Sequence, residues 1–164
     1  MTRRAIVGCA HSGISRTEPR LAGGAPPPGF ARRPGFGFMS PDGSRRSVLI
    51  VDDEESVRDA VCAALDAIGE FSVTLAPNGL SGLKMLESTR PDILLVDLVL
   101  PDIDGIQVLD AIRSNPAAHR PARIVLMTAY PDPFPLDKLR DLGADALLKK
   151  PFRLSQLSHA LGAR

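Results

Sequence analysis

Short apolar runs alternate with amphipathic segments along most of this chain. The apolar runs occupy residues 48–51, 72–75, 93–97, 123–127 and 145–148. Each has the length of a strand, and a run as continuously apolar as 93–97 is typical of a strand buried on both faces. After each run, apolar residues recur at helical spacing, over residues 57–68, 80–86, 106–112, 136–143 and 153–161. Five such pairs predict an α/β protein with a parallel sheet and helices on both faces.

Chemically active side chains follow four of the five predicted strands. Asp52 and Asp53 follow the first strand, Asp97 ends the third, Thr128 follows the fourth and Lys150 follows the fifth. The carboxyl ends of parallel strands meet at one edge of a sheet, where ligands usually bind. Three carboxylates crowded at that edge repel one another, and a hard divalent cation with oxygen ligands relieves the repulsion. We therefore expect a Mg²⁺ site there.

The same residues suggest a reaction. A cation, the ammonium of Lys150 and the hydroxyl of Thr128 around one carboxylate make a site suited to phosphoryl transfer. Asp97 would be the covalent acceptor. Each residue alone has a plainer interpretation, because an acid pair after a strand is more often a solvated turn or a helix cap. We interpret Asp102 and Asp104, in the loop that follows, as turn residues only.

Composition divides the chain of 164 residues in two. Residues 1–46 carry eight arginines against two acids, whereas residues 47–164 carry 12 basic and 17 acidic residues. The first part is rich in glycine and proline and is predicted to be disordered. It is either a basic arm for a polyanion or a membrane surface, or an appended start before translation from Met39. The acidic second part argues against nucleic acid as its main partner.

Two cysteines, Cys9 and Cys62, give neither a disulfide framework nor a metal-finger spacing. This pattern predicts a reducing compartment, the cytoplasm. No apolar stretch is long enough to cross a membrane, so no membrane association is expected.

Four motifs together resemble the receiver domain of two-component response regulators. They are LIVDDEE at 49–55, LVDLVLPDIDG at 95–105, MTA at 127–129 and KPF at 150–152. The resemblance covers residues 47–161 and is to a stand-alone, chemotaxis-regulator-like receiver. It implies a flavodoxin-like fold in which a five-stranded parallel sheet has the order 2-1-3-4-5.

The resemblance also implies a role for each site residue. Asp97 would take a phosphoryl group from a histidine of a sensor kinase or a histidine phosphotransfer protein. Asp53 would bind Mg²⁺ directly, Asp52 would help through water, and the backbone carbonyl of Val99 would complete the metal site. Two further residues, Thr128 and Lys150, would bind the phosphoryl oxygens, beside the small Ala129.

Two departures from the family pattern concern the output of the switch. Three positions before the lysine, where the family usually has an aromatic residue, this chain has Leu147, which cannot hydrogen-bond or swing as a ring does. Prolines at 131, 133 and 135 disfavour a helix there, so the fourth helix should start late, near Leu136. Leu147 removes the usual aromatic coupling between phosphorylation and the output face, and the prolines predict a shorter or displaced helix with an altered partner surface.

Val99 and Tyr130 flank the predicted acceptor without taking part in the chemistry. Apolar and bulky groups at these positions should exclude water from an acyl phosphate. We expect a phosphoryl group that lasts on the order of hours rather than seconds.

Three functions fit these residues. The first is a stand-alone receiver that acts as a phosphorylation switch read by an unknown downstream protein, without direct DNA binding. The second is a metal-dependent phosphatase with an aspartyl nucleophile, which Val99 disfavours because such enzymes usually have a second acid there. The third is a degenerate receiver that only scaffolds, an alternative kept open by Leu147.

Overall fold

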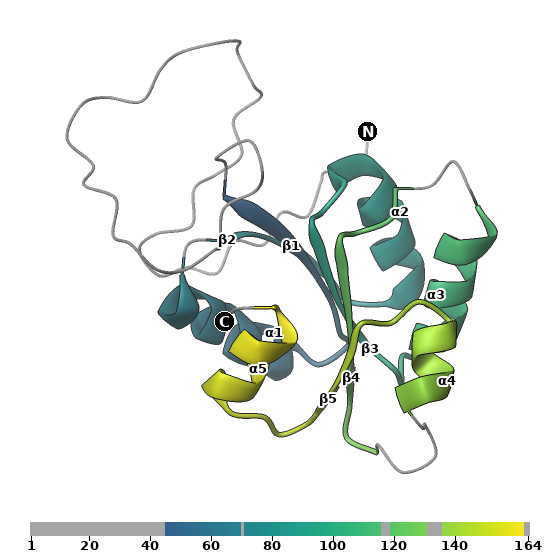
Figure 1. The fold of residues 1–164 in the computed structure, drawn as a ribbon. Helices are drawn as coiled ribbons and strands as arrows, with labels where there is room; N and C mark the ends of the chain where they lie inside the picture. The colour runs from purple at the N-terminus through teal and green to yellow at the C-terminus, as the bar shows by residue number, and fades with distance from the viewer. Residues whose placement is uncertain (1–44, 70, 116–118, 131–135, 163–164) are drawn as a thin grey trace, which may run out of the picture.

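The computed structural model describes residues 45–69, 71–115, 119–130 and 136–162 of the chain. Within this part, five strands alternate with five helices (Figure 1). The strands are β1 (Arg46–Val51), β2 (Phe71–Ala76), β3 (Ile93–Asp97), β4 (Arg123–Thr128) and β5 (Ala146–Lys149). The helices are α1 (Glu55–Ile68), α2 (Gly79–Thr89), α3 (Gly105–Ser114), α4 (Leu136–Asp141) and α5 (Leu154–Ala160).

The strands form one parallel sheet in the order β2-β1-β3-β4-β5, which confirms the predicted fold. The central strand β3 pairs with β1 on one side and with β4 on the other. Its residues are buried along its whole length, as a continuous apolar run predicts. Because all strands run in one direction, the residues after β1, β3, β4 and β5 emerge at the same edge.

Helices cover both faces of the sheet (Figure 1), and a hydrophobic layer on each face holds them to it. Alternate residues of β1 divide between them, because successive strand side chains point to opposite faces. Val48 and Ile50 pack in the layer that includes Leu65 of α1 and Leu157 of α5. The other layer contains Leu49, Val51, Leu86, Leu109 and Leu139, and so joins the sheet to α2, α3 and α4. The helices therefore cover both faces, two on one side and three on the other.

Two arginines of the sheet hold the C-terminal end of α5. The guanidinium Nε of Arg123 donates to the carbonyl of Ala160 at 2.8 Å, and Arg46 donates to that of Leu161 at 3.5 Å. The last carbonyls of a helix have no partner within the helix, so these side chains supply the missing donors. A helix of only seven residues is thereby anchored to β1 and β4.

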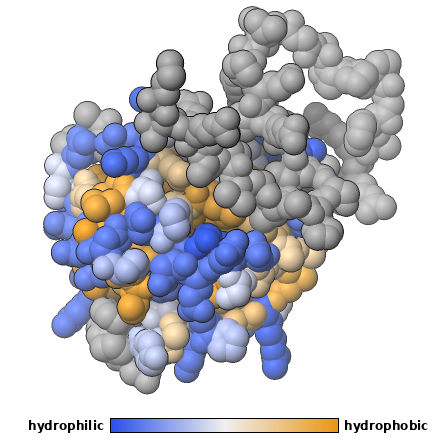
Figure 2. All heavy atoms as spheres, turned by 180° about the vertical axis from the view of Figure 1, so that it is seen from behind, coloured by the Kyte–Doolittle hydropathy of each residue, from blue (hydrophilic) through white to orange (hydrophobic). Residues whose placement is uncertain are grey.

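The observed boundaries differ little from those predicted. β1 opens at Arg46, one residue before the predicted boundary of the folded part at Ser47, while residues 1–44 lie outside the described residues. The helix α4 starts at Leu136, as the three prolines predict, although residues 131–135 are themselves not described. In the described part of the chain, no helix combines the length and the apolar character that a membrane span requires. Seen from behind, the surface of the described residues mixes hydrophilic side chains with smaller hydrophobic areas (Figure 2).

Candidate functional site

The predicted site residues meet at the carboxyl edge of the sheet. Beyond the paired strands, the backbone N–H of Leu98 donates to the carbonyl of Met127 at 2.8 Å. The backbone N–H of Lys150 donates to the carbonyl of Thr128 at 2.7 Å. These bonds extend the ladder past β3 and β5. They hold the residues that follow each of these strands against the neighbouring strand β4, at the edge of the sheet where Asp97 lies.

Lys150 joins two of the three predicted carboxylates. Its Nζ lies 2.5 Å from Oδ2 of Asp52 and 2.6 Å from Oδ2 of Asp97. The Lys150 side chain is 11% exposed, and those of Asp52 and Asp97 are 0% and 9% exposed. One ammonium group therefore pairs with two nearly buried carboxylates and balances one of their two negative charges, which lowers the cost of burying them.

Burial and pairing act on the ionisation of these groups in opposite directions. Burial raises the pKa of the Asp52 carboxyl above its ordinary value, although the hydrogen bond from Lys150 opposes the increase. Burial lowers the pKa of Lys150, but its bonds to Asp52 and Asp97 more than offset this, so its pKa is raised overall. The lysine is therefore a firmly held positive charge at neutral pH.

Asp53 lies beside this pair but is exposed to solvent. One carboxylate oxygen from each of Asp52, Asp53 and Asp97 lies within 4.8 Å of the others. An exposed carboxylate next to two buried ones leaves the cluster open on one side. Three oxygen donors so arranged have the ligand type that Mg²⁺ prefers.

The remaining oxygen of Asp97 and the hydroxyl of Thr128 are held by backbone groups. The N–H of Val99 donates to Oδ1 of Asp97 at 3.1 Å, and the N–H of Tyr130 donates to Oγ1 of Thr128 at 3.0 Å. The side chain of Thr128 is fully buried at the end of β4. Because β3 and β4 pair through Asp97 and Met127, Thr128 lies one position further along the same edge.

Large exposed apolar side chains lie at the same edge of the sheet. Among the described residues these are Leu80, Val99, Tyr130 and Leu154, with exposed fractions of 53%, 56%, 69% and 46%. Each lies in a loop after a strand or in the first turn of the next helix, at the carboxyl edge. The edge that carries the acidic centre thus also carries apolar groups that are open to solvent.

Arg58 and Asp102 are two site contacts that the sequence interpretation missed. A guanidinium nitrogen of Arg58, in the first turn of α1, donates to the backbone carbonyl of Asp52 at 2.6 Å. Asp102 accepts hydrogen bonds from the N–H groups of Gly79 and Leu80, both at 2.9 Å. Burial alone would raise the pKa of Asp102, but backbone donors, chiefly the N–H groups of Leu80, Ile103 and Gly79, lower it overall.

The interpretation of Asp102 and Asp104 as turn residues only was wrong. Asp102 holds the start of α2, while Asp104 caps α3 through a bond from the N–H of Gln107 at 2.7 Å. The side chain of Gln107 returns a bond to the N–H of Asp104, which completes a capping box. This second role has a local signal, an acid followed three residues later by glutamine, whereas the partners of Asp102 lie on a distant segment.

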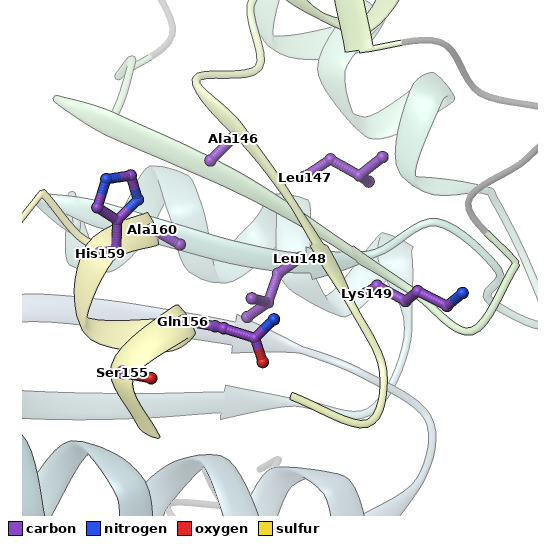
Figure 3. Close-up of a pocket in the computed structure, with 8 residues that line it drawn as sticks. All are labelled: Ala146, Leu147, Leu148, Lys149, Ser155, Gln156, His159 and Ala160. Atoms are coloured by element: carbon purple, nitrogen blue, oxygen red, sulfur yellow. The ribbon is translucent and has the colours of Figure 1, made fainter. Parts of the chain in front are cut away.

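A separate hollow of about 390 Å³ lies between β5 and α5 (Figure 3). Ala146 and Leu148 point from β5 toward α5, whereas Leu147 points to the opposite side (Figure 3). Leu147 is half-buried and packs in the layer of α2, α3 and α4. The position where an aromatic side chain is usual therefore contributes to the packing beside α4 here.

Comparisons with known proteins agree with this fold and edge. Residues 48–162 match the family described as the response regulator receiver domain. The transcriptional regulatory protein CseB of Streptomyces coelicolor is 36% identical over 105 residues, which cover 64% of this chain and 43% of CseB. The probable chemotaxis protein CheY of Rhizobium etli is 34% identical over 116 residues, covering 71% of this chain and 89% of that protein. This chain thus spans less than half the length of CseB and most of the chemotaxis protein.

Solved structures show the same likeness. The chemotaxis protein CheY4 of Vibrio cholerae superposes with a TM-score of 0.64 at 27% identity, covering 71% of this chain and 96% of that chain. A CheY-like receiver domain protein of Methanospirillum hungatei gives a TM-score of 0.59 at 26% identity, covering 71% and 90%.

A doubly wound parallel sheet with clustered aspartates and a lysine at its carboxyl edge defines a class of phospho-accepting signalling modules. The chain belongs to the response regulator receiver family of two-component systems, as its motifs predict. Members of this family are phosphorylated by histidine kinases and are signalling modules rather than classical enzymes.

Proposed function

We propose that this chain is the phosphorylation switch of a two-component pathway. Asp97 takes a phosphoryl group from a phosphohistidine of a sensor histidine kinase or a histidine phosphotransfer protein, in the cytoplasm and with Mg²⁺. A downstream protein then binds the altered surface. The observation that carries this proposal is the contact of Lys150 with both Asp52 and Asp97, next to Asp53.

In the transfer step, a carboxylate oxygen of Asp97 forms a bond to phosphorus while the bond from phosphorus to the histidine nitrogen breaks. The histidine ring, protonated on its other nitrogen, leaves with the electron pair as a neutral imidazole, so no further reactant is needed. The chain contributes positioning and charge, since phosphoryl transfer has little other covalent chemistry for a protein to assist. Asp97 is held for this by the N–H of Val99 and the ammonium of Lys150.

The acidic cluster fits a bound Mg²⁺ ion. The carboxylates of Asp52, Asp53 and Asp97 and the backbone carbonyl of Val99 are the donors we propose for it. Their oxygen atoms are of the type Mg²⁺ prefers, and the exposed side at Asp53 leaves room for water and phosphoryl oxygens. When bound, the ion neutralises charge that develops on the transferred group.

Thr128 and Lys150 are the groups that we propose for the phosphoryl oxygens. The Thr128 hydroxyl already accepts from Tyr130, and its own hydrogen would be donated to the phosphoryl group. Lys150 would exchange one carboxylate contact for a phosphoryl oxygen. Both residues are buried or nearly so, which strengthens such interactions.

Leu80, Val99, Tyr130 and Leu154 give the phosphoryl donor an apolar contact surface around the acidic centre. Exposed apolar groups near a reactive centre often mark a protein interface. For the output we propose the region of β4 and α4, where Leu147 packs in place of an aromatic side chain.

Incubation with acetyl phosphate and Mg²⁺ tests this function. Stable labelling that is lost in Asp97→Asn supports the switch, and Asp104→Asn, an acid of the same loop, serves as the control that keeps its label. Turnover of added phosphomonoesters would instead indicate the phosphatase, and no labelling would indicate a scaffold. Either of these two results contradicts the proposal.

A further inference from the structure

Asp102 links the loop after β3 to the start of α2. Its two carboxylate oxygens accept one hydrogen bond each, from the N–H groups of Gly79 and Leu80, both at 2.9 Å. These are the first two residues of α2, and such N–H groups have no acceptor within the helix. The helix has its own cap, since Asn78 accepts from the N–H of Ser81 at 2.9 Å. Asp102 therefore joins two segments of the chain, since it lies 23 positions after Gly79 and 22 positions after Leu80.

The contact between these segments is close. A Cβ atom on Gly79 would lie 2.3 Å from Cγ1 of Ile103 and 2.9 Å from its carbonyl oxygen. Real Cβ atoms are essentially never found so near another atom, so the loop rests directly on the backbone of α2. A side chain at position 79 would force the loop away from the helix.

The same loop is fixed to its own strand at its far end. The N–H of Gly105 donates to the carbonyl of Leu98 at 3.0 Å, and a Cβ on Gly105 would lie 2.6 Å from the carbonyl of Asp97. Val99 thus lies in a loop with two anchors, one at Gly105 and one at Asp102. Its N–H binds the Asp97 carboxylate at 3.1 Å.

We infer that Asp102 is a positioning residue for the metal site, because it fixes the loop that presents the backbone of Val99 beside Asp97. This inference rests on the proposed function, in which the Val99 carbonyl binds Mg²⁺. Asp102 itself is not among the proposed ligands. Without the Asp102 anchor the loop can move off α2, and the carbonyl no longer stays in place for binding.

If Asp102 only capped α2 and did not position the metal site, the expected result would differ. Loss of a cap lowers the stability of the protein but leaves the affinity for Mg²⁺ unchanged. Asp104 provides the matched control, because it carries the same charge in the same loop and also caps a helix, but it binds within α3 rather than α2. Alanine at either position removes one negative charge from the same loop, so the pair controls for the change in net charge.

The experiment is a Mg²⁺ titration at fixed ionic strength. The chain has no tryptophan and one tyrosine, Tyr130, so tyrosine emission reports on the rim of the site directly. We expect Asp102→Ala to weaken apparent Mg²⁺ affinity by about tenfold, as loss of groups that orient ligands usually does. Asp104→Ala should stay within about twofold of the wild type, and Asp102→Asn, which keeps one of the two acceptors, should lie between the two alanine variants.

A second variant tests the inference without a change in charge, and it does not require that Asp102→Ala folds. Gly79→Ala pushes the loop from the opposite side and leaves every carboxylate in place, so it should also weaken Mg²⁺ affinity. In hydrogen exchange, the N–H of Leu80 should lose protection in Asp102→Ala but not in Asp104→Ala.

Equal Mg²⁺ affinities in wild type, Asp102→Ala and Gly79→Ala would overturn the inference while leaving the proposed function standing. Equal weakening in Asp102→Ala and Asp104→Ala would also overturn it, because charge alone would then account for the effect. A wild-type chain that binds no Mg²⁺ would overturn the proposed function and this inference together.

Discussion

The ammonium group of Lys150 lies 2.6 Å from the carboxylate of Asp97, although the two residues are 53 positions apart in the chain. The fold creates this contact by ending β3 and β5 at the same edge of a parallel sheet. Lys150 also binds Asp52 at 2.5 Å, so it is the counter-charge for two nearly buried carboxylates.

Replacing Lys150 with methionine should destabilise the protein in the absence of Mg²⁺. Two carboxylates would stay at a nearly buried position without their cation, and breaking such a pair from one side costs about 3 kcal/mol in the free energy of unfolding. Saturating Mg²⁺ should restore part of this loss, because the ion supplies positive charge at the same place. Urea unfolding with and without Mg²⁺ measures both effects.

Lys149→Met is the control for this change, because its side chain is exposed next to Lys150. It should alter the free energy of unfolding by no more than about 0.5 kcal/mol. A Lys150→Met protein as stable as the wild type without Mg²⁺ would show that the ion pairs contribute no net stability.

The same pair predicts how stability depends on alkaline pH. The folded-state pKa of Lys150 is raised above its ordinary 10.5, so folding is favoured as long as the lysine is protonated. The contribution is fully present below the unfolded pKa and is lost as the pH rises through the folded one. The stability difference between wild type and Lys150→Met should therefore stay constant from about pH 7 to 10 and shrink above that range. A difference that widens in alkali would contradict the assigned sign.

Val99→Asn should shorten the life of the phosphoryl group on Asp97. We expect the wild-type group to last on the order of hours, because apolar groups at Val99 and Tyr130 disfavour an attacking water molecule. An asparagine amide can instead hydrogen-bond that water. Decay of the phosphorylated protein after removal of the donor gives the rate.

Leu80→Asn is a suitable control, because Leu80 is another exposed apolar residue at the same edge and lies on α2 rather than next to Asp97. It should leave the decay rate unchanged. Equal rates in wild type and Val99→Asn would remove the basis for water exclusion by Val99.

Arg123→Ala should loosen α5. The substitution removes the 2.8 Å bond to the carbonyl of Ala160, and a bond from a charged donor contributes about 1.5 kcal/mol to the free energy of unfolding. Arg113→Ala offers a comparison, since Arg113 and Asp110 pair on the surface with side chains 57% and 55% exposed. That change should cost no more than about 0.5 kcal/mol. Similar losses in both variants would argue against a specific role for Arg123.

Much of the fold was predictable from the sequence, because its signals are local. A strand buried on both faces is apolar throughout, and the acid or polar group that follows marks its end, as at Asp97 and Thr128. Since parallel strands end at one edge, the sequence alone predicts that Asp52, Asp97 and Lys150 lie close together.

Of the contacts that the sequence interpretation missed, some have a local signal and others have none. The capping box of Asp104 and Gln107 could have been read from their spacing. The partners of Asp102 could not, because Gly79 and Leu80 approach it only after α2 and α3 have packed on the same face. The exposure of Val99 and Tyr130 likewise depends on loop conformation rather than on the residues themselves.

We propose that clustered carboxylates hold Mg²⁺ so that Asp97 carries the phosphoryl group. Borohydride reduction converts an aspartyl phosphate to homoserine, so peptide mass spectrometry after treatment with acetyl phosphate locates the modified residue. We predict homoserine at position 97 when Mg²⁺ is present and none when it is chelated. Modification at Asp52 or Asp53 instead, or equal modification of Asp97 with and without Mg²⁺, would contradict the account.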